Sequence, residues 1–229
     1  MKKYAVVVGG GTGKRMGNII PKQFLLLKGK AVVWYTLDTF LRAYHDLQVI
    51  LVLPEQHMQK GRTIAASFTD SNRIEIVPGG DTRFHSVQCG LKKIKDEDTV
   101  VFVHDAVRCL VSVPLIHRCY KAALENGSAI PAVAATDSIR IINHTYHSVA
   151  DRRNVRIIQT PQTFLGKLIL PAFKQEYNEA FTDEATVVEG SGKKIFLTEG
   201  EYDNIKITRP VDMMIAEKIL EERSALKQL

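Results

Sequence analysis

The sequence predicts a three-layer α/β domain in which helices cover both faces of a mainly parallel sheet and a β-hairpin protrudes from it. Three observations lead to this fold class. Continuous apolar runs of strand length recur along the chain, segments with helical spacing lie between them, and one stretch breaks this rhythm. The chain has 229 residues, of which 45% are hydrophobic. That is the size of one domain, residues 1–229, with ample apolar surface for a full core.

Strands are predicted where short apolar runs stand between polar segments. Strands of a parallel sheet are buried on both faces, so their residues need not alternate between apolar and polar. The runs are Tyr4–Val8, Gln48–Leu53, Arg73–Val77, Thr99–Val103 and Ser128–Ala135.

Helices are predicted in the segments between the strands. The expected helices are 32–41, 82–94, 112–126 and 211–226. Apolar side chains recur in them at helical spacing. Ser112 followed by Pro114 is typical of a helix start, and the third helix is expected to end near Asn126-Gly127.

Residues 137–159, DSIRIINHTYHSVADRRNVRIIQ, do not fit this alternation of strands and helices. They hold two alternating β-type runs around Asn143-His144, which predict a hairpin. An isolated two-stranded hairpin is barely stable in water, so it is expected to lean on another surface. A second subunit is the natural candidate, and packing on its own domain is the alternative.

The composition restricts the class of partner and the compartment. The formal net charge of +6 suits a phosphorylated ligand. The alternative is that this charge is spread over the surface and indicates no particular ligand. The sequence contains no Lys/Arg block of the kind that indicates nucleic-acid binding. Three scattered cysteines, the absence of a signal peptide and the absence of a membrane-spanning apolar run predict a cytoplasmic protein that binds no membrane.

The loop after the first strand, GGGTGKRMGNIIPKQF (residues 9–24), is rich in glycine and cations. It is not a P-loop, because Val8 and Arg15 stand where that motif needs glycine and Ser or Thr. It is not a dinucleotide-binding fingerprint, because Met16 replaces the third glycine. A glycine turn that can bring backbone N–H groups against a ligand, with nearby cations, predicts a phosphate site. A simple turn with solvated charges is the alternative.

This loop, with PKQF at its end, resembles the signature loop of the sugar-phosphate cytidylyltransferases. Later blocks of the sequence match the same family in order: GGDTRFHSVQCGL, VHDAVR, QTPQTF, FTDEATVVE and NIKITRPVDM. The resemblance covers nearly the whole chain. It implies a Rossmann-like nucleotidyltransferase fold.

The resemblance also implies a reaction, in which CTP and a sugar phosphate give a CDP-linked product and pyrophosphate with Mg²⁺. An ionised phosphate oxygen attacks, so the site needs alignment and charge stabilisation rather than a base. The acceptor is expected to be 2-C-methyl-D-erythritol 4-phosphate, with ribitol 5-phosphate as the alternative. A non-catalytic nucleotide-binding regulator on the same fold is a third reading.

The resemblance assigns roles by position. Nucleotide contacts fall to Gly9, Gly10, Gly11, Gly13, Gly80, Asp81 and Ser86, the last three around the cytosine. The predicted catalytic cations are Arg15, Lys22, Arg152 and Lys206, of which Arg15 and Lys22 would bind the triphosphate. Acceptor contacts are expected from Asp105, Arg108, Arg152, Thr182 and Lys206, and metal contacts from Asp105 and Asp203. Asp105 as a turn residue, Thr182 and Asp183 as helix caps and Lys206 as a solvated lysine are the alternatives.

In this family a β-arm crosses to the partner of a homodimer and brings an arginine to the neighbour's site. Counting back eight residues from Thr160 in TPQ places that role on Arg152. The nearby arginines at 140, 153 and 156 leave an uncertainty of register.

The chain departs from the family pattern at two places. Gly9-Gly10 stand where alanines are common, which predicts a looser loop, and Cys109 replaces a proline after Arg108, which leaves that turn freer. Two histidine features are interpreted as structural. His144 and His147 are expected to be exposed rather than metal-bound, and His104 is expected to orient the loop at its strand end.

Overall fold

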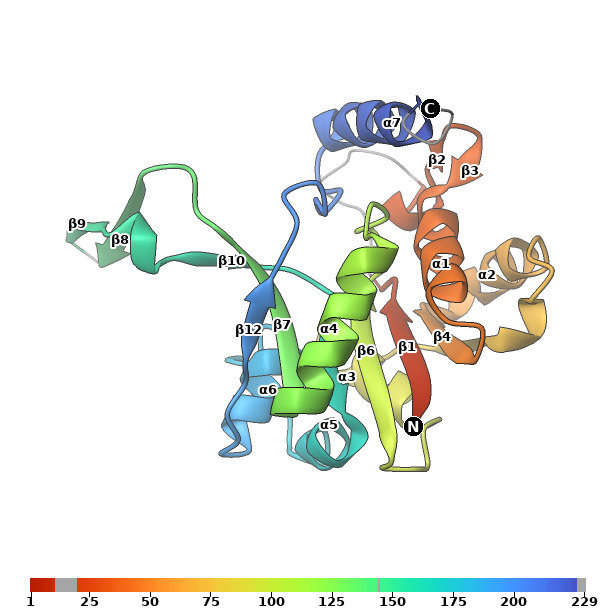
Figure 1. Ribbon diagram of the computed structural model, residues 1–229, viewed down its shortest axis with the longest axis horizontal. Helices are drawn as coiled ribbons and strands as arrows, with labels where there is room; N and C mark the ends of the chain where they lie inside the picture. Colours follow the sequence, from red (N-terminus) through yellow and green to blue (C-terminus); the bar gives the residue numbers. More distant parts are fainter. Residues whose placement is uncertain (11–19, 144, 226–229) are drawn as a thin grey trace.

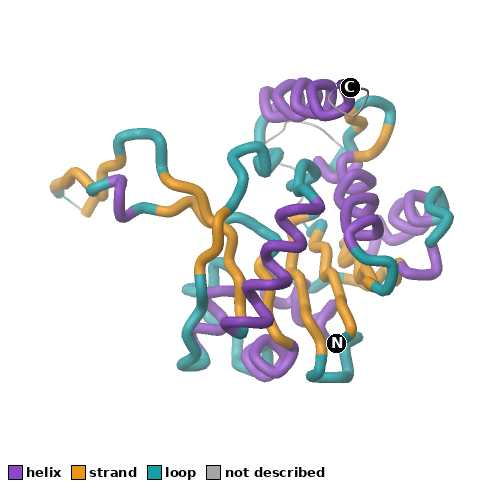
Figure 2. The backbone as a smooth tube through the Cα atoms, viewed as in Figure 1, coloured by secondary structure: helices purple, strands orange, loops and turns teal. Residues whose placement is uncertain are grey.

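The structure, a computed structural model, describes residues 1–10, 20–143 and 145–225. Within these residues an eight-stranded sheet lies between helices (Figures 1 and 2). Its strand order is β10-β7-β11-β6-β1-β4-β5, and β12 pairs with β7 outside this path. The strands are β1 (Lys2–Val8), β4 (Leu47–Leu53), β5 (Ile74–Pro78), β6 (Thr99–Asp105), β7 (Ser128–Ala134), β10 (Arg156–Ile158), β11 (Gln162–Leu165) and β12 (Leu197–Glu199).

The predicted strands form the parallel part of this sheet. β1 pairs in parallel with β4 and β6, and β4 pairs in parallel with β5. β11 lies antiparallel between β6 and β7, and β10 is antiparallel to β7. The mainly parallel sheet is therefore confirmed, with an antiparallel portion that the apolar runs did not predict.

Helices cover both faces of the sheet, which confirms the three-layer architecture (Figure 1). The helices are α1 (Val32–Ala43), α2 (Met58–Ala65), α3 (Arg83–Leu91), α4 (Val113–Asn126), α5 (Gly166–Ala172), α6 (Glu184–Gly190) and α7 (Pro210–Ala225). Ala5 and Val7 of β1 pack in one core with α1 and α4. Val6 and Val8 pack in a second core with α3, α5 and α6. Alternate residues of one strand thus enter two cores, which is why its buried residues 5–8 are all apolar.

A third core carries the remaining elements. α7 packs through Ala216 against Leu27 and Val32. Leu27 belongs to a small two-stranded sheet of β2 (Leu26–Leu27) and β3 (Lys30–Ala31). The C-terminal helix predicted from residue 211 is therefore confirmed through Ala225.

The predicted helix-end signals act as caps. The Ser112 hydroxyl accepts a hydrogen bond from the backbone N–H of Leu115 at 3.0 Å. Gly127 ends α4 with φ of 84°, in the left-handed region that favours glycine.

The predicted hairpin is confirmed within the segment 137–159, but it does not extend to residue 159. β8 (Ile139–Asn143) and β9 (Tyr146–Ala150) pair with each other and project from the body of the molecule (Figure 1). Residues 156–158 instead join the main sheet as β10. A short 3₁₀ helix, Arg152–Asn154, connects the two parts. We use "the arm" below for residues 139–154.

The described part of the chain has no helix long and apolar enough to cross a membrane. Cys89, Cys109 and Cys119 form no disulfide. Burial raises the pKa of the Cys109 and Cys119 thiols to about 12, so both are un-ionised at neutral pH.

Candidate active site

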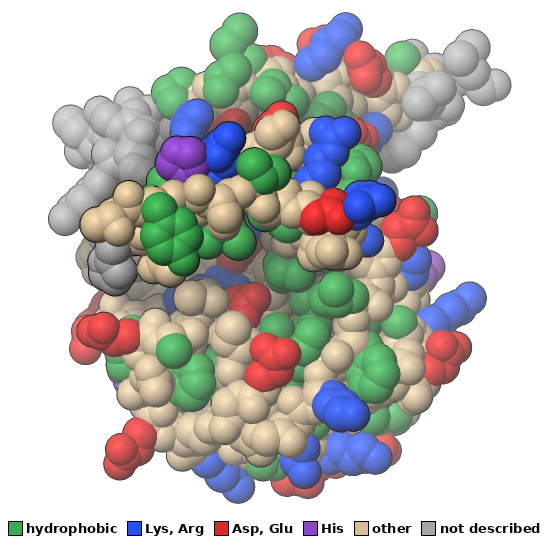
Figure 3. Space-filling view, turned by 90° about the vertical axis from the view of Figure 1, so that its left-hand side faces the viewer, with side chains coloured by type: hydrophobic (Ala, Val, Ile, Leu, Met, Phe, Trp, Pro, Cys, Tyr) green, Lys and Arg blue, Asp and Glu red, His purple; other side chains and the backbone are tan. Residues whose placement is uncertain are grey.

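A cavity opens at the carboxyl ends of β1, β5 and β6, where ligands bind in open α/β sheets. In Figure 3 the arm crosses the face turned to the viewer, and a recess lies below it. The predicted residues that line the cavity are Gly9, Gly10, Lys22, Gly80, Asp81, Ser86, Asp105 and Lys206. Gln23 and Arg83, which were not predicted, also line it.

The other predicted residues have different positions. Gly11, Gly13 and Arg15 lie outside the described residues, as does His144. The described residues Arg108, Arg152, Thr182 and Asp203 are not among those that line the cavity.

The first wall of the cavity is the end of β1 and the short 3₁₀ helix Lys22–Phe24. The backbone N–H of Gly9 donates to the Val52 carbonyl at 2.9 Å, and the Gln23 side-chain amide donates to the Gly9 carbonyl at 2.6 Å. These bonds fix the point where the chain leaves the sheet and mount Lys22 beside it. A Cβ on Gly9 would lie 2.9 Å from the Cδ2 atom of Leu53, so the alanine common in the family would require the Leu53 side chain to shift. Gly10 has that room.

The second wall is the turn that leads into α3. The backbone N–H of Gly80 donates to the Ser86 hydroxyl at 3.2 Å, and that hydroxyl donates to the Gly80 carbonyl at 3.1 Å. A Cβ on Gly80 would meet the Cβ of His85 at 2.5 Å, so this position needs glycine. Thr82 caps α3 by accepting from the backbone N–H of His85. The turn therefore presents fixed backbone groups and the Asp81 carboxylate to a ligand.

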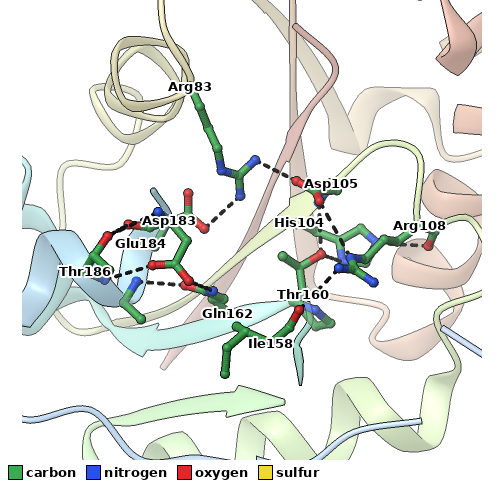
Figure 4. A network of polar contacts seen from close by, with 12 residues as sticks. Arg83, His104, Asp105, Arg108, Ile158, Thr160, Gln162, Asp183, Glu184 and Thr186 are labelled. Carbon is green, nitrogen blue, oxygen red and sulfur yellow. Dashed lines mark hydrogen bonds and ion pairs between the residues drawn. The ribbon is translucent and has the colours of Figure 1, made fainter. Parts of the chain in front are cut away.

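Asp105 lies at the end of β6 among three cations, of which Figure 4 labels Arg83 and Arg108. Its Oδ1 accepts from Arg83 at 2.6 Å. Its Oδ2 lies 2.8 Å from the Lys206 ammonium and 3.6 Å from Nε of Arg108. Burial opposes ionisation of Asp105, but Arg83, Lys206 and Arg108 outweigh it and hold the pKa of the carboxyl well below its usual range. Asp105 is therefore ionised at neutral pH.

Arg83 links Asp105 to a second buried carboxylate. Its Nη2 donates to Glu184 at 2.9 Å (Figure 4). Burial lowers the pKa of the Arg83 guanidinium, but the two carboxylates more than offset this and raise it. Glu184 is the first residue of α6, and Asp183 caps this helix. The cap is therefore Asp183, while Thr182 is exposed just before it.

The Arg108 side chain donates hydrogen bonds to backbone carbonyls and is not among the described residues that line the cavity. Its guanidinium donates to the carbonyl of Asn204 at 2.8 Å and to that of Ile158 at 3.3 Å. These bonds tie the segment before Lys206 and the end of β10 to the β6 turn. The predicted contact between Arg108 and the acceptor phosphate stays a prediction.

The two carboxylates predicted to hold Mg²⁺ do not fit a protein-held metal. Both Asp105 oxygens face cations, and Asp203 lies 3.4 Å from Arg223. In the described ranges no group of three or more His, Cys, Asp or Glu side chains could hold a metal ion. Mg²⁺ prefers several oxygen ligands, which a carboxylate surrounded by cations does not offer.

His104 orients the strand end, in agreement with its interpretation from sequence. Its Nε2 lies 3.1 Å from the Arg108 carbonyl, which can only accept, so Nε2 carries the proton. Nδ1 then accepts from the Thr160 hydroxyl at 3.0 Å, whose oxygen accepts the backbone N–H of Asp105 at 3.1 Å. One neutral imidazole thus fixes both ends of the HDAVR turn.

We expect His104 to make folding stability depend on pH. Burial lowers the pKa of the folded His104 to about 3 from an ordinary 6.5. Between these values the unfolded chain binds the extra proton, so the free energy of unfolding falls as pH drops. The loss between pH 7 and pH 5 should be about 2 kcal/mol. Urea unfolding at both pH values, with wild type and His104→Gln, measures it. An equally large pH dependence in the variant would contradict the assignment.

Sequence reasoning missed Arg83 and Glu184. Both lie inside matched blocks, in GGDTRFHS and FTDEA. Arginine and glutamate are mostly exposed in proteins, so residue type gave no reason to place them in the interior. The block matches were the signal that could have found them.

Comparisons with known proteins show which family the chain belongs to. The family model for 2-C-methyl-D-erythritol 4-phosphate cytidylyltransferase matches residues 4–222. The cytidylyltransferase of that name from Phocaeicola vulgatus is 39% identical over 220 residues, which are 96% of this chain and 100% of the relative. The one from Clostridium botulinum is 36% identical over 225 residues, covering 96% of this chain and 98% of the relative.

A solved structure has the same fold. The 4-diphosphocytidyl-2C-methyl-D-erythritol synthase from Anaerococcus prevotii matches with a TM-score of 0.82 and 29% identity. The match covers 96% of this chain and 98% of that one. The predicted nucleotidyltransferase fold is confirmed, and the chain belongs to the 2-C-methyl-D-erythritol 4-phosphate cytidylyltransferase family.

Proposed function

We propose that this enzyme transfers CMP from CTP to 2-C-methyl-D-erythritol 4-phosphate in the non-mevalonate pathway of isoprenoid biosynthesis. The products are 4-CDP-2-C-methyl-D-erythritol and pyrophosphate. Family membership over residues 4–222 carries the proposal. The site supports it, because its cavity combines a fixed glycine turn with the cations Lys22, Arg83 and Lys206.

The reaction needs no general base. An oxygen of the acceptor phosphate attacks the α-phosphorus of CTP, and the bond from that phosphorus to the bridging oxygen of the β-phosphate breaks in line. The attacking oxygen is already ionised near neutral pH, so no proton has to be removed. Lys22 faces the triphosphate and stabilises the charge that develops on it. Lys206, oriented by Asp105, holds the acceptor phosphate.

Mg²⁺ is proposed to arrive with CTP, on the oxygens of the triphosphate. Both oxygens of Asp105 and one oxygen of Asp203 already face cations, so these two carboxylates would not hold the ion. Asp105 then serves the acceptor, whose hydroxyls can donate to its carboxylate.

We also propose a homodimer in which the arm completes the neighbour's site through Arg152. The arm projects from the body and exposes large apolar side chains, with Ile142 81% and Val149 68% exposed. Exposed apolar surface of this kind marks interaction sites. The Arg153 guanidinium contacts both oxygens of Asp151, whereas Arg152 donates only to the Thr136 carbonyl among the described residues. This favours Arg152 over Arg153 for an anionic ligand.

The test is pyrophosphate release with CTP and a panel of polyol phosphates. We expect 2-C-methyl-D-erythritol 4-phosphate to give a higher kcat/KM than ribitol 5-phosphate. The opposite preference would make ribitol 5-phosphate the acceptor. No pyrophosphate with any acceptor would support the non-catalytic nucleotide-binding regulator.

A further inference from the structure

Glu184 is a carboxylate enclosed in the protein with a side chain only 2% exposed. Its mount is rigid. The Gln162 side chain on β11 donates to Asp183 at 2.8 Å and accepts from the backbone N–H of Ala185 at 2.8 Å, so it holds both neighbours of Glu184. Asp183 and Thr186 close the start of α6 with a reciprocal capping box. The backbone that carries Glu184 is therefore tied to β11 of the sheet.

Arg83 transmits that position to the cavity. Its guanidinium is planar, and its two outer nitrogens bind Glu184 at 2.9 Å and Asp105 at 2.6 Å (Figure 4). Fixing one nitrogen of a planar fork limits the directions open to the other. Asp105 in turn binds Lys206 at 2.8 Å through its second oxygen. An ordered chain thus runs from Glu184 through Arg83 and Asp105 to Lys206.

Glu184 lies behind Arg83, because the described residues that line the cavity include Arg83, Asp105 and Lys206 but not Glu184. A buried ion pair is often no more stable than apolar residues of the same volume. Stability alone therefore gives weak reason for a carboxylate here. Geometry gives a stronger reason for a carboxylate at this position. With only one carboxylate partner, the planar guanidinium of Arg83 could rotate about that contact.

We propose that Glu184 is a positioning residue for the transfer reaction. It acts through Arg83 to hold Asp105, and through Asp105 to aim Lys206 at the acceptor phosphate. The proposal rests on the acceptor role given to Asp105 and Lys206 above. Without the Glu184 charge, Arg83 can turn toward Asp105 and compete with Lys206 for its oxygens. Binding of the acceptor should weaken. The turn at Gly80 and Ser86, which serves the nucleotide, has its own hydrogen bonds and should be unaffected.

The test compares Glu184→Gln with Glu189→Gln, an exposed glutamate on the same helix. Glutamine keeps the shape and one accepting oxygen but removes the charge. We expect Glu184→Gln to raise the KM for the acceptor about tenfold, the scale found for partners that orient a ligating group. The KM for CTP should change less than twofold, and Glu189→Gln should behave as wild type.

A double variant, Arg83→Gln with Glu184→Gln, separates positioning from folding. It leaves neither member of the pair as an uncompensated buried charge, so it should fold even if Glu184→Gln alone does not. We expect it to melt near wild type and to keep the acceptor-specific defect. Lower melting temperatures with unchanged KM values, or equal rises in both KM values, would overturn the proposal. Failure of the proposed function is distinguishable, because wild type itself would then release no pyrophosphate or would prefer ribitol 5-phosphate as the acceptor.

Discussion

Replacement of Lys22 by alanine should lower kcat by roughly 100- to 1,000-fold, the usual effect of removing one preorganised group that stabilises transition-state charge. Lys22 is 9% exposed and lines the cavity. The 3₁₀ turn that carries it is closed by the bond from the Phe24 N–H to the Pro21 carbonyl at 2.9 Å. Gln23 ties the same turn to Gly9 at the end of β1. The backbone that carries Lys22 is therefore held in place before the reaction starts.

The expected signature is a loss in kcat with a much smaller change in the KM for CTP. Charge on the α-phosphate and on the leaving pyrophosphate grows in the transition state, so a cation aimed there contributes most at that point. Steady-state kinetics measures both constants, and circular dichroism checks that the variant is folded. Lys121→Ala on the exposed side of α4 is the matched control and should leave both constants unchanged. A raised KM with near-normal kcat would show that Lys22 only binds CTP.

Mixing two nearly inactive variants should restore about a quarter of wild-type activity if Arg152 acts in the neighbouring subunit. The variants are Lys22→Ala and Arg152→Ala, unfolded and refolded together so that about half of the dimers are mixed. In a mixed dimer, the Arg152→Ala chain keeps its own Lys22 and receives Arg152 from its partner. That site is complete, and the other site carries both substitutions.

The reason for the expected recovery is the arm. β8 and β9 form a two-stranded sheet of their own, and Arg152 follows it in a short 3₁₀ helix. The Arg152 side chain is exposed and is not among the described residues that line the cavity of its own chain. A second subunit would let it reach an acceptor phosphate.

Two controls make this experiment decisive. Arg153→Ala alone should keep near-normal activity, because Asp151 already holds that guanidinium. Native mass spectrometry must show the mixed dimers. If mixed dimers are present and the mixture is no more active than the separate variants, then Arg152 contributes to the site of its own chain. The arm would then have no part in the neighbouring site.

The sequence predicted those parts of the fold that local patterns encode. Apolar runs identified β1, β4, β6 and β7, because strands buried on both faces are largely apolar. They also identified β5, although this strand lies at the edge of the sheet and exposes Glu75. Ser112 and Gly127 marked the ends of α4, because a side-chain cap and a left-handed residue act within one turn of the helix. The antiparallel insertion of β11 between β6 and β7 left no such pattern, since pairing direction depends on distant segments.

For the candidate site, too, the sequence predicted some features and not others. The matched blocks located Gly9, Gly10, Lys22, Gly80, Ser86, Asp105 and Lys206, and the structure brings these residues to one cavity. Asp203 was predicted from its block to hold a metal with Asp105, yet in the fold it lies beside Arg223. A block match gives a residue's place in the chain but not which charge will face it.

By itself, then, the sequence determined the layers of the fold, the helix ends, the family resemblance and most residues of the cavity wall. Only the tertiary structure decided how the charges pair. Arg83 meets Asp105 across 22 positions of sequence and Glu184 across 101, and the folding of β6, α3 and α6 against one another brings the three together. Pairing of buried charges depends on distance and on loss of water, and neither quantity exists until the chain has packed.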